Sequence, residues 1–120
     1  MATILIVEDE IFVRETAEWI IEDFGYDTLV AEDMDQAVAF LSAPGRIDGL
    51  FVDIRLNTLV LGGYDVANRA FSMRPNLPVL YTSGTPLSAE MSGRFVVGGR
   101  FLQKPYSPSQ LGVSLEQLVS

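Results

Sequence analysis

Short apolar runs rich in β-branched residues alternate five times with longer segments whose apolar residues recur at helical spacing. This alternation constrains the fold more than any other feature, because parallel strands joined by right-handed helical crossovers are its usual outcome. Helices then cover both faces of the sheet. We therefore predict an α/β fold, a doubly wound sheet of five parallel strands at residues 3–7, 28–31, 49–52, 77–81 and 101–102.

The helices of this fold are predicted with unequal clarity. The first extends to Gly25, and the last has a capping box from Ser107 to Gln110 with Pro108 at the first helical position. The fourth, near residues 87–94, is poorly patterned. The predicted helices lie near residues 13–24, 37–41, 64–73, 87–94 and 108–118.

Composition limits what such a domain does. The 120 residues, 48 % of them hydrophobic, suit a single domain over residues 1–120 and leave no room for an output domain. The net charge of -8 disfavours nucleic acids and anionic membranes as partners. Because cysteine and histidine are absent, disulfides, zinc fingers and His-dependent triads are excluded. No apolar run approaches the roughly 20 residues of a membrane span, so we expect a cytoplasmic protein.

Four of the five predicted strands end in polar or charged residues. Ligands of an open parallel sheet bind outside the carboxyl ends of its strands, so these residues are expected to share one site. In chain order they are Glu8 and Asp9, Asp53, Thr82 and Ser83, and Lys104, which is the only lysine of the chain.

The residue types at this edge favour phosphoryl chemistry. Three carboxylates brought together repel one another unless a cation offsets their charge, and Mg²⁺ prefers such oxygen ligands. With Mg²⁺ as cofactor, one carboxylate can attack a phosphoryl group and become an aspartyl phosphate. The ammonium of Lys104 and a hydroxyl of Ser83 or Thr82 would then contact oxygens of that group.

In order and spacing, these residues resemble the receiver domain of two-component response regulators over essentially the whole chain. The resemblance implies a flavodoxin-like sheet with strand order 2-1-3-4-5. It implies that Asp53 is the phosphoacceptor, that Asp9 binds Mg²⁺ directly and that Glu8 binds it through water. The carbonyl of Arg55 would be a further ligand of Mg²⁺.

The resemblance also implies a conformational switch. Ser83 matches the switch hydroxyl of the family, and Lys104 matches the lysine that pairs with the phosphoryl group. Phe101 matches the aromatic residue that turns inward when the hydroxyl moves. The peptide bond between Lys104 and Pro105 is expected to be cis.

Two features depart from the family pattern. Glu8 stands where aspartate is commoner, a change that a contact through water tolerates. The loop after Asp53 is about two residues longer than is usual in the family and carries three apolar residues at positions 59–61. We interpret this segment either as a flap that contacts a partner or a second copy of the chain, or as a locally packed loop.

Most of these residues also have a plain structural interpretation. For Trp19, which lies off the main apolar face of the first helix, we favour a partly buried structural role over a partner contact. The alternatives for the site are an N-cap at Asp9, a turn at Asp53, a loop hydroxyl at Ser83 with Thr82 as its rival, a surface lysine at Lys104 and a core aromatic at Phe101.

The function expected from this resemblance is that of a phosphoacceptor, not of an enzyme with turnover. Its partners would be a histidine kinase or a histidine phosphotransfer protein, and the chain would be a monomer or weak homodimer. A receiver segment of a hybrid histidine kinase is a close variant. The alternatives are a Mg²⁺-dependent phosphohydrolase, which commonly has an aspartate where Arg55 stands, and a degenerate receiver that only binds.

Overall fold

Strand and helix alternate throughout the computed structural model, which describes residues 2–56 and 62–120. The apolar segment 59–61, interpreted above as a flap or a packed loop, lies outside the described residues. The elements are β1 (Thr3–Val7), α1 (Ile11–Asp23), β2 (Asp27–Ala31), α2 (Met34–Ser42), β3 (Gly49–Asp53), α3 (Gly62–Met73), β4 (Val79–Ser83), α4 (Ala89–Ser92), β5 (Arg100–Gln103) and α5 (Pro108–Val119).

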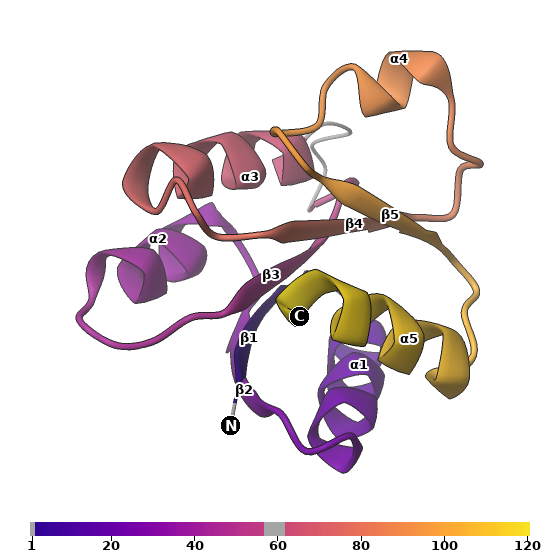
Figure 1. The fold of residues 1–120 in the computed structure, drawn as a ribbon, viewed down its shortest axis with the longest axis horizontal. Coiled ribbons are helices and arrows are strands. Elements are labelled where there is room, and N and C mark those ends of the chain that lie inside the picture. The colour runs from indigo at the N-terminus through magenta and orange to yellow at the C-terminus, as the bar shows by residue number, and fades with distance from the viewer. Residues whose placement is uncertain (1, 57–61) are drawn as a thin grey trace.

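The sheet has the predicted topology. Each strand pairs in parallel with its neighbours, and the order across the sheet is β2-β1-β3-β4-β5. Such an order requires a crossover helix between consecutive strands, as Figure 1 shows. The predicted flavodoxin-like α/β fold is confirmed.

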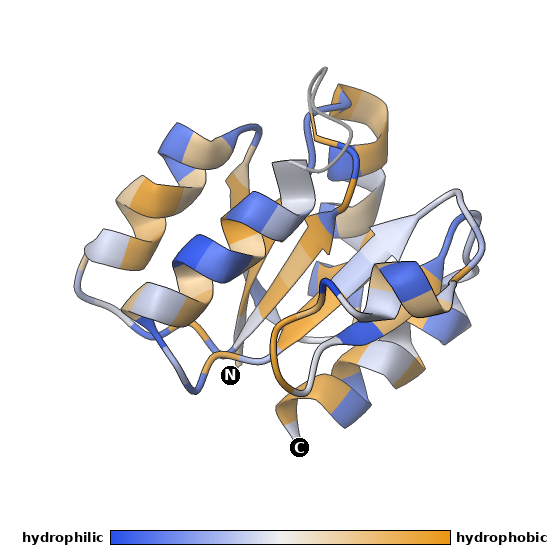
Figure 2. Cartoon of the chain, turned by 90° about the horizontal axis from the view of Figure 1, so that it is seen from above, coloured by the Kyte–Doolittle hydropathy of each residue, from blue (hydrophilic) through white to orange (hydrophobic). Residues whose placement is uncertain are grey.

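Helices cover both faces of this sheet. In Figure 1, α2 and α3 lie on one side of the strands and α1 and α5 on the other, and each pair closes a separate apolar cluster. Every residue of the central strand β3 is buried, because both of its faces are covered. Figure 2 shows largely apolar strands at the centre and helices in which apolar and hydrophilic stretches alternate.

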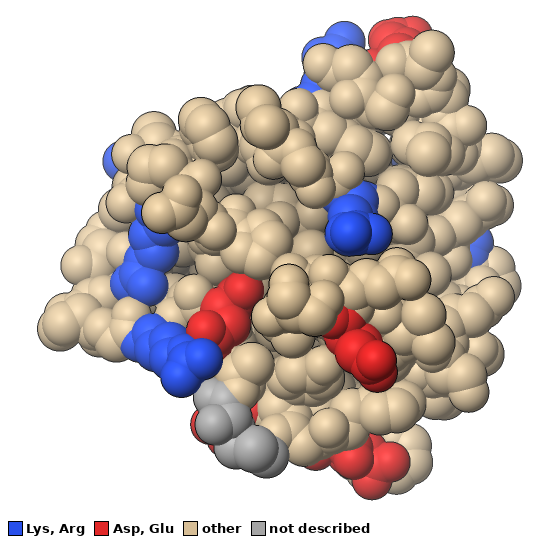
Figure 3. All heavy atoms as spheres, viewed as in Figure 1, with Lys and Arg blue, Asp and Glu red and all other residues tan. Residues whose placement is uncertain are grey.

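The face drawn in Figure 3 shows small groups of charged residues among uncharged ones, and in places an acidic residue lies beside a basic one. Within the described ranges, no helix combines the length and the apolar character needed to cross a membrane.

The fourth strand and the fourth helix differ from their expected ranges. β4 begins at Val79 instead of residue 77 and continues to Ser83. Pro78 has no N–H to donate to the ladder, although its carbonyl accepts the N–H of Leu50. α4 has only four residues and buries none of them, which accounts for its weak sequence pattern.

The prediction that Trp19 is partly buried is wrong, because its side chain is 71 % exposed. The buried face of α1 consists of Ala17, Ile20 and Ile21. At 100° per residue, position 19 points away from all three. Trp19 is therefore an exposed aromatic residue on the outer side of α1.

Two glycines permit close contacts between elements. A Cβ on Gly63 would overlap the backbone of Asp53 and Ile54, so a side chain there would push the start of α3 away from the end of β3. The ring of Phe24 occupies the place of a Cβ on Gly112, which brings α5 close to α1. Gly63 thus allows the start of α3 to lie directly against the end of β3, where Asp53 stands.

Candidate functional site

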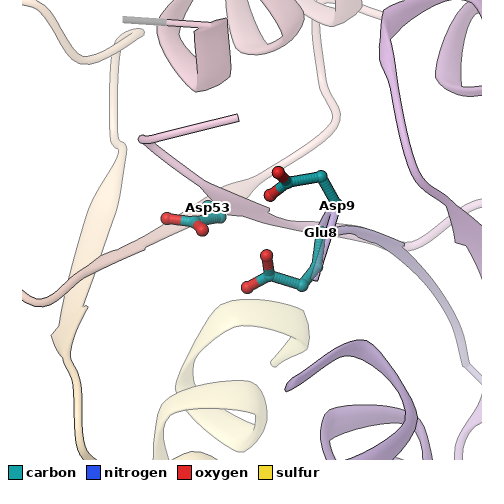
Figure 4. Close-up of side chains that lie close together, drawn as sticks. All are labelled: Glu8, Asp9 and Asp53. Atoms are coloured by element: carbon teal, nitrogen blue, oxygen red, sulfur yellow. The ribbon is translucent and has the colours of Figure 1, made fainter. Parts of the chain in front are cut away.

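The register of the central strands brings the polar strand ends together. β1 and β3 pair through Val7 and Val52, and Asp53 at the end of β3 pairs with Thr82 of β4. Glu8 follows Val7, so it reaches the same edge of the sheet as Asp53. In Figure 4 the side chains of Glu8 and Asp9 extend toward Asp53, and the three carboxylates lie close together at the ends of two neighbouring strands.

These three carboxylates form a group that could hold a divalent cation. One oxygen from each of them lies within 4.8 Å of the others. Glu8 and Asp53 are only 4 % and 7 % exposed, whereas Asp9 is partly exposed. Oxygen-only donors with a partly open side fit Mg²⁺, which keeps several waters and takes one or two carboxylates.

The ammonium of Lys104 joins two of these carboxylates. Its Nζ donates to Glu8 Oε1 at 2.8 Å and to Asp53 Oδ2 at 3.1 Å. The backbone N–H of Lys104 donates to the carbonyl of Ser83, which ties the end of β5 to the end of β4. The bond between Lys104 and Pro105 is cis, as the resemblance implies.

Burial and charge change the acidity of this cluster. Burial raises the pKa of Glu8 to about 7, with the charge of Asp53 acting in the same direction and Lys104 opposing it. Burial disfavours the charged form of Lys104 as well, but Glu8 and Asp53 outweigh it and raise the pKa of this ammonium. Burial also raises the pKa of Tyr106 to about 12. The site thus holds a carboxyl that titrates near neutrality.

The two candidate hydroxyls, Ser83 and Thr82, lie in different places. Ser83 lines the open pocket of the carboxylates together with Gly84 and Thr85, and its Oγ accepts the N–H of Thr85 at 3.1 Å. Thr82 lines a small cavity that adjoins this pocket, since Glu8, Val13 and Asp53 line both. Of the two candidates, Ser83 is the one that lines the open pocket.

Arg55 lies beside the phosphoacceptor candidate. Its backbone N–H donates to Asp53 Oδ1 at 3.2 Å, and its exposed side chain lines the open pocket. This contact, together with the Lys104 contact, gives each oxygen of Asp53 one hydrogen-bond donor. Both donors restrict the rotation of the carboxylate.

Phe101 belongs to a stack of aromatic rings behind the site. Its ring lies 6.3 Å from that of Phe95, which stacks on Tyr81 at 4.1 Å. The hydroxyl of Tyr81 accepts the N–H of Val96 at 3.0 Å, so the segment after α4 is fixed to β4. Sequence reasoning placed Tyr81 in the fourth strand but missed its stacking on Phe95, because residues 93–99 carry no periodic pattern.

An apolar groove borders the site on the side of α1. Phe12, Thr16 and Ile20 line it from α1, and Pro105 and Tyr106 line it from the loop before α5. Gly84 and Lys104 also line this groove, so it adjoins the open pocket. Sequence reasoning missed it, although the aromatic residue directly after the Lys-Pro pair was a possible signal.

Comparisons with known proteins agree with this geometry. The chain is 32 % identical over 119 residues to the nitrogen assimilation regulatory protein NtrX of Azorhizobium caulinodans, covering 95 % of this chain and 25 % of that protein. It is 29 % identical over 113 residues to the protein PilG of Pseudomonas aeruginosa, covering 90 % of this chain and 80 % of that protein. The chain thus spans a quarter of the length of the first relative.

A solved structure leads to the same conclusion. A response regulator receiver protein from Sinorhizobium medicae superposes with a TM-score of 0.87 at 30 % identity, covering 98 % of this chain and 94 % of that one. The sequence profile described as "Response regulator receiver domain" matches residues 4–116. The chain belongs to the response regulator receiver domain family.

Proposed function

We propose that residues 1–120 form one receiver domain of a two-component phosphorelay and that Asp53 is its phosphoacceptor. The observation that carries this proposal is the meeting of three carboxylates and one ammonium at the sheet edge, with Lys104 Nζ 3.1 Å from Asp53 Oδ2. A carboxylate nucleophile, a pairing cation and room for a divalent ion are what phosphoryl transfer to an acid requires.

In the proposed step, an oxygen of the Asp53 carboxylate attacks the phosphorus of a phosphohistidine. The new O–P bond forms as the P–N bond breaks, and the electron pair of that bond returns to the imidazole nitrogen of the donor. The donor imidazole then takes up a proton from solvent. A histidine kinase or a histidine phosphotransfer protein is the donor that we propose.

Glu8, Asp9, Asp53 and the carbonyl of Arg55 would hold Mg²⁺, Asp9 directly and Glu8 through water. When bound, the ion neutralises charge on the transferring phosphoryl group. The chain's own residues do the rest: the Arg55 N–H orients Asp53, and Lys104 leaves its carboxylate partners to pair with a phosphoryl oxygen.

The signal would pass from Ser83 to Phe101. The Ser83 hydroxyl, which now accepts from Thr85, would turn to donate to a phosphoryl oxygen. Lys104 connects Ser83 to the strand that carries Phe101, because its backbone N–H, directly after β5, donates to the Ser83 carbonyl. Inward movement of Phe101 would change its packing against the ring of Phe95, whose centroid lies 6.3 Å away.

The apolar groove beside the site is the docking surface that we propose for the phosphohistidine donor. It opens next to Lys104, and the side chain of Phe12, which lines it, is 74 % exposed. A donor seated there would bury this ring while its imidazole reaches the pocket of Asp53.

Intact-mass measurement after incubation with acetyl phosphate tests the phosphoacceptor. With Mg²⁺ the wild type should gain one phosphoryl group, and both Asp53→Asn and the sample without Mg²⁺ should gain none. Labelling that persists in Asp53→Asn would refute the assignment. Continuous release of phosphate, in molar excess over the protein, would favour the phosphohydrolase. Arg55, two residues after Asp53, disfavours that alternative.

A matched pair of variants tests the docking surface. Phe12→Ser should slow labelling by a phosphohistidine protein and leave labelling by acetyl phosphate unchanged. Val97→Ser is the control, because this apolar side chain is 90 % exposed but lies outside the groove. Equal effects of both substitutions would reject the groove as the docking surface.

A further inference from the structure

A small cavity lies beneath the carboxylates, between the sheet and α1. Its volume is about 10 Å³, close to the ~10–15 Å³ that is needed, on the same measure, to hold one water molecule. Ile6 and Phe51 of the sheet and Ala17 of α1 contribute apolar wall. Glu8, Val13 and Asp53 line both this cavity and the open pocket, whereas Thr82 lines the cavity and Ser83 lines the pocket.

The hydroxyl of Thr82 is the unexplained group at this cavity. Thr82 is 3 % exposed and lines the cavity, and its Oγ1 has no hydrogen-bond partner among the described residues. A buried hydroxyl without a partner is costly, and native proteins satisfy nearly all such groups. The geometry therefore calls for a small polar ligand at this position.

Two carboxylate-bearing residues, Glu8 and Asp53, line the same cavity. Asp53 pairs with Thr82 across β3 and β4, so the two side chains are neighbours on one face of the sheet. A water molecule that accepts the proton of the Thr82 hydroxyl keeps two protons to donate to the carboxylates. It would then have three partners, within the two to four that a buried water uses.

We propose that this cavity binds one water molecule, held by Thr82 Oγ1 and donating to the carboxylates of Asp53 and Glu8. Arg55 and Lys104 already hold the two oxygens of Asp53 from the open pocket. The water holds the same carboxylate from the interior. Thr82 thereby acts as a positioning residue for the phosphoacceptor, at a site separate from the switch hydroxyl.

Thr82→Val tests the water site, because it exchanges the hydroxyl for a methyl group of similar volume. If the hydroxyl bonds a water, this variant should unfold at a lower temperature than the wild type. A crystal structure of the wild type should show one ordered water within hydrogen-bond distance of Thr82 Oγ1, and the variant should lack it. An unchanged or higher unfolding temperature, or no such water in the wild type, would overturn the proposal.

The positioning role has its own readout, which rests on the proposed phosphorylation of Asp53. At saturating Mg²⁺, Thr82→Val should be labelled by acetyl phosphate about 2- to 10-fold more slowly, the range expected for one modest hydrogen bond. Thr82→Ser, which keeps the hydroxyl, should keep the water and the wild-type rate. A wild-type rate in Thr82→Val would reject the positioning role, whereas absence of labelling in the wild type would reject the phosphoacceptor and leave the water site to the crystallographic test.

Discussion

The pKa of Glu8 makes the stability of the metal-free protein depend on pH in an unusual range. The folded protein holds this pKa at about 7, against an ordinary value of 4.5. The protonated carboxyl is favoured in the folded state, so its contribution to stability is complete below pH 4.5 and is lost as the pH rises through 7. Between about pH 5.5 and pH 8, the free energy of unfolding should fall by about 2 kcal/mol.

This loss should be measurable because few other groups titrate in the same interval. The chain has no histidine and no cysteine, and ordinary carboxyls are already ionised. A fall of about 2 kcal/mol corresponds to a decrease of roughly 6–10 °C in Tm for a domain of this size. Thermal unfolding in EDTA, followed by far-UV circular dichroism across the pH series, gives the slope directly.

Glu8→Gln is the decisive variant, because it removes the titrating group and keeps the shape. The variant should lose the slope and exceed the wild type in stability at pH 8. Mg²⁺ should also flatten the slope of the wild type, since a bound cation favours the ionised carboxyl. A wild-type slope that persists in Glu8→Gln, or a stability that rises with pH, would show that burial does not govern this carboxyl.

Three further predictions concern the geometry of the site. Lys104→Ala should bind Mg²⁺ at least as tightly as the wild type, because a competing cation is removed, but should lose the conformational change on phosphorylation. Titration calorimetry measures the binding, and NMR shifts with and without phosphodonor measure the change. A normal conformational change would make the lysine dispensable. Asp9→Asn should weaken Mg²⁺ binding more than Glu8→Gln does, since only one is expected to bind the ion directly, and equal losses in calorimetry would contradict the ligand order. Gly63→Ala should destabilise by ~1–3 kcal/mol through overpacking against the β3 backbone, whereas Gly84→Ala, with nothing within 4 Å of its Cβ position, should be neutral in urea unfolding.

The fold was predictable because alternation of strand and helix leaves few topologies. The meeting of Glu8, Asp9, Asp53 and Lys104 followed from the same argument, since parallel strands bring their carboxyl ends to one edge. The boundaries were less certain. β4 is displaced by two residues because the exact start of its ladder depends on Pro78, and α4 is short because its segment has no apolar face to bury.

Other features of the site depend on three-dimensional packing that no sequence pattern encodes. The shift in the pKa of Glu8 arises from burial, which depends on neighbours distant in the chain. Ser83 and Thr82 could be told apart only once the register of β4 was known. Adjacent strand residues face opposite sides of the sheet, and the sequence does not say which of the two faces the pocket. The stack of Phe95 on Tyr81 joins an irregular segment to a strand.

The exposure of Trp19 has a practical consequence for following this protein by fluorescence. It is the only tryptophan of the chain, and its indole is 71 % exposed in the folded state. Its emission should therefore resemble that of indole in water whether the chain is folded or unfolded, which makes it a poor reporter of denaturation. Trp19 lies on α1, one turn beyond Thr16 of the apolar groove, so a donor that covers this helix would shift the emission to shorter wavelength. The same chromophore that is nearly silent on unfolding is well placed to report association.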